Sequence, residues 1–200
     1  MDEGARASLA RLDEITRRLR VECPWDREQD ERSIVPHTVE EAYELADAAY
    51  RSDDAKLLDE LGDVLFQVHF LALLLEERGA GSLAEVAEHC TEKLIRRHPH
   101  VFGEVEAETA GEVLKNWDQI KRDVEGRDLL GDVPENLPGL LYARKILRRT
   151  EPDGGGKSDP ETRDELEREV GNELLEAVRR ARARGVDPEL AVRAAAKRLL

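Results

Sequence analysis

Residues 60–77 read ELGDVLFQVHFLALLLEE and contain the most apolar stretch of the chain. Its apolar residues are too dense for the single buried face of a surface helix, so its second half is expected at the centre of a helical bundle. Asp63, Gln67 and His69 interrupt the apolar run, which falls short of the ~20 residues that span a bilayer. We therefore expect a long buried helix over residues 54–77 and no membrane anchor.

Further helices are expected on both sides of this stretch, because apolar residues recur there at helical spacing. These helices cover residues 3–20, 33–50 and 82–97. The step from Cys23 to Pro24 ends the first of them, and a loop containing Trp25 and Asp26 follows. Aromatic residues make up only 4% of the chain, which is typical of helical proteins. The expected fold is an all-α four-helix bundle.

The second half of the chain has more turns and a short stretch rich in glycine. Helices are expected over residues 112–125, 140–149, 161–184 and 187–200. The run EPDGGGKSDP at 151–160 has the composition of a flexible linker. We therefore expect one domain at 1–150, the linker at 151–160, and a helical tail at 161–200.

The tail contains a faint internal repeat. ELGDVL at 60–65 is echoed by EVGNEL at 169–174, so that Asn172 stands where Asp63 does. Two interpretations stay open: a degenerate second copy without its own metal site, and chance similarity between two glutamate-rich helices.

Charge and cysteine usage exclude several functions. A net charge of −14 argues against nucleic-acid binding, which normally requires a basic face. Cys23 and Cys90 lack the spacing of a zinc site, and the N-terminal residues carry no apolar signal segment. These features favour a reducing cytoplasm and no membrane partner.

Four carboxylates stand at helical spacings that suit a metal site. Glu41 and Glu44 share one helix face, and Glu60 and Asp63 share another. On adjacent antiparallel helices they would repel one another unless a hard cation such as Mg²⁺ or Mn²⁺ lay between them. A solvated acidic face is the alternative for the first pair. The apolar neighbours of Asp63 argue against it, since an unpaired carboxylate is costly to desolvate.

These residues resemble a known family. EEAYE at 40–44, followed after fifteen residues by ELGD at 60–63, is similar to the signature of the MazG nucleotide pyrophosphohydrolases. Further segments of the same family's N-terminal-type domain extend the resemblance to about residues 8–150: CPWD at 23–26 with Gln29, KLIRRHPHVF at 93–102 and WDQIK at 117–121.

The resemblance implies a function and a set of site residues. The reaction would be hydrolysis of a nucleoside triphosphate to a monophosphate and pyrophosphate, in a homodimer or higher homo-oligomer. The catalytic residues would be Glu40, Glu41, Glu44, Glu60 and Asp63, the last four as ligands of Mg²⁺, with Mn²⁺ as a possible substitute. Glu40 keeps three open roles: orienting a ligand, accepting a water proton, or facing solvent. The substrate-binding residues would be Lys56, Lys93, Arg97, Trp25, Trp117 and Lys121.

The acidic helices have three alternative interpretations. A di-iron carboxylate bundle normally needs Glu-x-x-His on two helices, and this sequence has none. A non-catalytic helical scaffold that retains a metal site is a second alternative. A third is a relative of narrower specificity, acting on phosphoribosyl-ATP or one particular deoxynucleotide.

Overall fold

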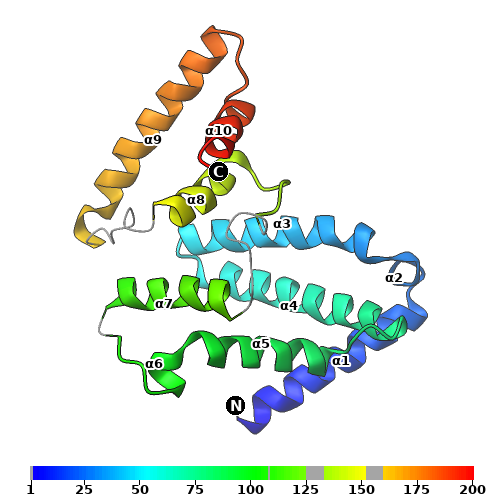
Figure 1. Ribbon diagram of the computed structural model, residues 1–200. Coiled ribbons are helices and arrows are strands. Elements are labelled where there is room, and N and C mark those ends of the chain that lie inside the picture. Colours follow the sequence, from blue (N-terminus) through cyan, green and yellow to red (C-terminus); the bar gives the residue numbers. More distant parts are fainter. Residues whose placement is uncertain (1, 108, 125–132, 152–159) are drawn as a thin grey trace. The chain divides into compact units, whose positions relative to one another are not determined.

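The structure is a computed structural model that describes residues 2–107, 109–124, 133–151 and 160–200 (Figure 1). These residues form ten α-helices and no strand, which confirms the all-α prediction. The chain divides into two compact units, Met1–Ile95 and Arg96–Leu200. No described helix is long and apolar enough to cross a membrane. The linker predicted at 151–160 falls almost entirely outside the described residues, and the predicted domain boundary stays a prediction.

The first unit is built around two long antiparallel helices. Its complete helices are α1 (Glu3–Glu22), α2 (Pro24–Glu28), α3 (Glu31–Tyr50) and α4 (Asp54–Glu77), and α5 (Leu83–Arg97) begins in it. α3 packs along α4, and α1 contacts both α2 and α4 (Figure 1). The core is Ile34 from α3 with Phe70 and Leu74 from α4. The second half of α4 is thus buried, as its apolar sequence predicts.

Local signals fix where these helices begin and end. Asp30 and Ser33 form a reciprocal capping box, so α3 begins at Glu31, two residues before the predicted start. The Asp53 side chain caps α4, after a turn in which Ser52 takes a left-handed φ of 55°. The loop predicted around Trp25 is instead the short helix α2, because Pro24 is preorganised for a first helical position.

The polar residues that interrupt α4 face neighbouring helices. Gln67 is buried, and its amide oxygen accepts a 3.4 Å hydrogen bond from Thr38 on α3. His69 is also buried, with Nδ1 3.8 Å from a carboxylate oxygen of Asp13 on α1. Gln67 and His69 therefore each face one of the two helices that pack on α4.

The second unit contains α6 (Pro99–Phe102), α7 (Ala110–Asp123), α8 (Gly139–Thr150), α9 (Pro160–Ala183) and α10 (Pro188–Lys197). α10 packs on α8 around a core of Tyr142, Ile146 and Ala196 together with Val133. A Cβ at Gly139, at the start of α8, would lie 2.6 Å from Oε2 of Glu189 and 2.8 Å from Cγ1 of Val192, so these side chains would have to shift.

The repeated segment 169–174 lies on α9 and is solvent-exposed throughout, including Asn172. Its origin as a second copy stays a prediction.

Candidate functional site

Three of the predicted metal ligands converge between α3 and α4. Carboxylate oxygens of Glu41 on α3 and of Glu60 and Asp63 on α4 all lie within 4.8 Å of one another. Residues three apart share a helix face, so Glu60 and Asp63 both turn toward α3. This is the juxtaposition that the two acidic motifs predict for adjacent antiparallel helices.

The burial of these ligands differs from the expectation. Asp63 is exposed, whereas Glu60 is only 5% exposed. The apolar setting inferred for Asp63 is therefore wrong, because the apolar side chains on either side of it project onto other faces of α4. The carboxylate that is costly to desolvate is therefore that of Glu60. Asp63 lies at the solvent-exposed side of the three carboxylates.

Electrostatics at the group favour a bound cation. Burial raises the pKa of Glu41, and repulsion from Asp63, Glu44, Glu60 and Glu40 raises it further. Oxygen-only ligands with accumulated negative charge suit a hard divalent cation. Glu41, Glu60 and Asp63 therefore fit such an ion by the chemistry of their donors.

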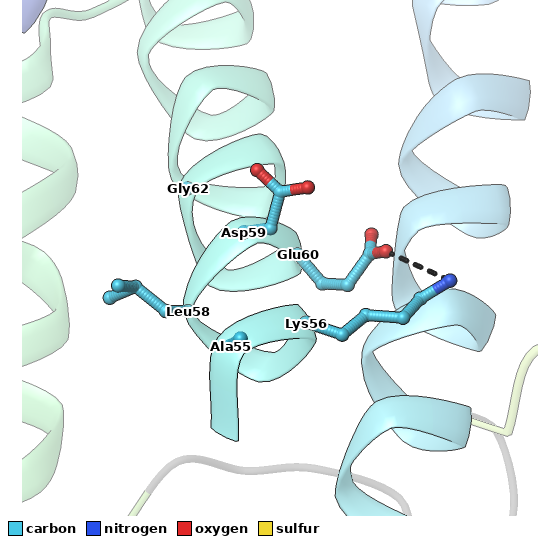
Figure 2. A pocket seen from close by; sticks show the side chains of 6 residues that line it. All are labelled: Ala55, Lys56, Leu58, Asp59, Glu60 and Gly62. Atoms are coloured by element: carbon cyan, nitrogen blue, oxygen red, sulfur yellow. Dashed lines mark ion pairs between the residues drawn. The ribbon is translucent and has the colours of Figure 1, made fainter. Parts of the chain in front are cut away.

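Lys56 joins the fourth predicted ligand to this group. Glu44 lies outside the three converging carboxylates, but the Lys56 ammonium is 3.8 Å from its Oε2 and 3.5 Å from Oε1 of Glu60. Figure 2 shows the lysine and Glu60 side chains extending from α4 toward α3. The i,i+4 salt bridge that α4 alone would allow is present, and a contact to α3 adds to it.

An open hollow of about 520 Å³ adjoins the lysine. It is lined by residues of the first turns of α4, among them Lys56 and Glu60 (Figure 2). The remaining lining residues are Ala55, Leu58, Asp59 and Gly62. Both partners of the Lys56–Glu60 ion pair therefore border this hollow.

Trp25 contacts His37, a residue that the sequence analysis missed and that stands one helical turn before Glu40 and Glu41 on α3. Its indole meets the ring of His37 edge-on, with centroids 5.8 Å apart. Nδ1 of His37 lies 3.3 Å from Oε2 of Glu40, which is itself largely exposed. The spacing of His37, three residues before Glu40 and four before Glu41, is the signal that could have revealed it.

Comparison with known proteins places these residues in a family. A model of the MazG nucleotide pyrophosphohydrolase domain matches residues 29–102, which include all the converging carboxylates. A Thermotoga maritima protein named nucleoside triphosphate pyrophosphohydrolase/pyrophosphatase MazG is 37% identical over 198 residues, covering 89% of this chain and 76% of that protein. The chain belongs to the MazG family.

Other relatives match this chain over different shares of their own length. The nucleoside triphosphate pyrophosphohydrolase of Escherichia coli is 44% identical over 131 residues, covering 64% of this chain. This MazG chain spans about half the length of that relative, 50%. An uncharacterized 26.1 kDa protein of Streptomyces cacaoi is 40% identical over 194 residues, covering 95% of this chain and 78% of that protein.

The remaining MazG-like segments place Arg97 and Trp117 within the unit 96–200, whereas Lys93 belongs to the first unit. The buried guanidinium of Arg97 lies over the Trp117 ring at 5.7 Å. His98 meets the same indole edge-on at 5.5 Å. Lys93 is half-buried on α5, four residues before Arg97. Lys121 belongs to α7, but its side chain lies outside the described part of the structure.

Proposed function

We propose that this MazG chain is a magnesium-dependent nucleoside triphosphate pyrophosphohydrolase. The reaction is (d)NTP + H₂O → (d)NMP + pyrophosphate. The observation that carries the proposal is the convergence of Glu41, Glu60 and Asp63 within 4.8 Å, inside the segment that matches the MazG domain. The names of the Thermotoga and Escherichia coli relatives supply the substrate class.

Glu41, Glu60 and Asp63 would hold the divalent cation, with Glu44 beside them. When bound, Mg²⁺ or Mn²⁺ neutralises phosphate charge and lowers the pKa of a coordinated water. The protein's own contribution is positional: the carboxylates of two rigid helices are held in one place before the substrate arrives.

Glu40 is not one of the three converging carboxylates. It precedes Glu41 on α3, and its exposed carboxylate is 3.3 Å from Nδ1 of His37. A carboxylate that binds no cation keeps its lone pairs for a proton, so Glu40 is the proposed acceptor of the proton released by the attacking water.

Cationic and aromatic side chains would bind the nucleotide. The Lys56 ammonium lies 3.5 Å from Oε1 of Glu60 and is the proposed contact to the polyphosphate. Trp25 is 51% exposed, so its indole is available to stack on a base. The other proposed contacts are Lys93, Arg97, Trp117 and Lys121.

A homo-oligomer is proposed because the first unit leaves apolar side chains in solvent. Along α4, Leu58, Leu61, Leu65 and Val68 recur at helical spacing and are 37–75% exposed. Such a stripe is unusual on a monomeric surface. Sedimentation of the purified protein tests this: Leu61→Glu is expected to shift the molecule toward monomer, and a wild-type monomer would contradict the proposal. A cytoplasmic location stays a prediction from the cysteine usage.

The test of the catalytic assignment is a comparison of carboxylate variants. Glu60→Gln and Asp63→Asn are expected to lower Mg²⁺-dependent hydrolysis by roughly 100-fold or more, since they remove a cation ligand. Glu88→Gln, an exposed glutamate on α5, serves as the control and should retain wild-type activity. Undiminished hydrolysis in Asp63→Asn would overturn the assignment.

A further inference from the structure

The carboxylate of Glu60 forms an ion pair with a lysine of the same helix. Its side chain is only 6% exposed, and the Lys56 ammonium lies 3.5 Å from Oε1. The same ammonium is 3.8 Å from Oε2 of Glu44 on the neighbouring helix. A buried carboxylate without a compensating positive charge is strongly destabilising. In this arrangement one lysine compensates two of the carboxylates that form the acidic site.

We propose that Lys56 is the resident counter-cation of the metal-free site and exchanges with the divalent ion. On metal binding its ammonium leaves Glu60 and Glu44, and the freed charge then contacts the polyphosphate. The inference rests on the proposed function, because it concerns the loading of the same site. It assigns the lysine two successive partners, first the carboxylates and then the substrate.

The side chain is suited to this exchange. Lys56 is 43% exposed at its side chain and lines the open hollow, so that it has solvent to move into. A lysine ammonium is a compact charge on a flexible side chain. Unlike the planar guanidinium of arginine, it does not require a fixed bidentate geometry. Because a divalent ion beside Glu60 would be repelled by a neighbouring ammonium, the two cations compete.

An ordinary salt bridge makes a different prediction. If Lys56 served only to stabilise the first turns of α4 through Glu60, its removal would leave polyphosphate binding unchanged, whatever its effect on metal binding. A counter-cation that exchanges gives opposite signs: its removal strengthens metal binding and weakens polyphosphate binding. The changes in metal affinity and in polyphosphate affinity, measured together, therefore distinguish the two roles.

The first measurement is Mn²⁺ binding to the nucleotide-free full chain, followed by electron paramagnetic resonance. Lys56→Met is expected to lower the Mn²⁺ dissociation constant roughly tenfold. Lys145→Met, which removes one exposed positive charge on α8, is the matched control and should bind Mn²⁺ as the wild type does. Equal or weaker Mn²⁺ binding by Lys56→Met would overturn the proposal.

The second measurement uses inorganic tripolyphosphate at saturating Mn²⁺. Its affinity for Lys56→Met is expected to fall roughly tenfold, and Lys56→Arg, which keeps the charge, should recover most of it. Unchanged tripolyphosphate binding by Lys56→Met would contradict the second half of the exchange. Lys56→Gln repeats both titrations should the methionine variant fail to fold, as judged by circular dichroism.

Glu60→Gln distinguishes failure of this proposal from failure of the proposed function. If Mn²⁺ binding depends on Glu60 but Lys56→Met does not strengthen it, the exchange is wrong and the metal site stands. If neither the wild type nor Lys56→Met binds Mn²⁺ in a way that depends on Glu60, the metal site itself is wrong and the exchange is wrong with it.

Discussion

The guanidinium of Arg20 on α1 pairs with both carboxylate oxygens of Glu77 at the end of α4, at 2.8 and 2.9 Å. The same guanidinium donates to the backbone carbonyls of Asp26 and Gln29. One side chain therefore fastens α1 to α4 and holds the middle and the C-cap of α2, the helix that carries Trp25. The position of that indole beside α3 depends on it.

Arg20→Ala is expected to lower the free energy of unfolding by about 2 kcal/mol, because several charge-assisted hydrogen bonds are lost together. Urea denaturation measures the loss. The control is Arg18→Ala, whose bridge to Glu22 lies within α1 with both side chains at least 60% exposed, and which should change stability by less than ~0.5 kcal/mol. Equal effects of the two substitutions would show that Arg20 does not stabilise the packing of α1 on α4.

Glu41→Gln is expected to stabilise the metal-free protein at neutral pH. The raised pKa of Glu41 means that folding favours its protonated form. Its contribution to stability is therefore present below the ordinary glutamate pKa of about 4.3 and is lost as pH rises through the higher folded value. The glutamine variant lacks this loss, so its melting temperature in EDTA should exceed that of the wild type at pH 7 and converge with it near pH 4.

Added Mn²⁺ should reverse this order. The wild type gains stability by binding the ion, whereas Glu41→Gln has lost a ligand and gains less. Glu88→Gln controls for the removal of one negative charge. A lower melting temperature for Glu41→Gln in EDTA at pH 7 would contradict the repulsion inferred at the site.

Trp25→Ala is expected to raise KM for a nucleoside triphosphate about tenfold or more, because stacking on a base contributes about 1–3 kcal/mol. Trp25 is half-exposed, so its removal leaves no large core cavity. Tripolyphosphate is the matched control ligand, since it has phosphates and no base, and its affinity should be unchanged. Equal weakening of both ligands would assign Trp25 a structural role instead.

The sequence predicts much of α3 and α4 correctly for identifiable reasons. The apolar run that ends in Leu74 requires burial, and the i,i+3 spacing of Glu60 and Asp63 places both on one face of α4. These regularities are local to one helix. They suffice to predict an acidic group between two antiparallel helices, and Glu41 confirms that the helices face one another as expected.

Features that depend on contacts between helices were not predictable in the same way. Periodicity does not reveal that Glu60 is buried and Asp63 exposed, because that depends on which face α3 covers. The contact of Lys56 with Glu44 requires the register of α4 against α3. The approach of Trp25 to His37 requires the path of α2, which Arg20 fixes from a third helix.

Hydrolysis between the α and β phosphates is tested by phosphorus NMR of the products, after incubation of the purified chain with a nucleoside triphosphate and Mg²⁺. Cleavage between the α and β phosphates gives the monophosphate and pyrophosphate in equal amounts, and Asp63→Asn and Glu41→Gln should suppress both. A diphosphate with orthophosphate, or undiminished pyrophosphate from both variants, would contradict the account.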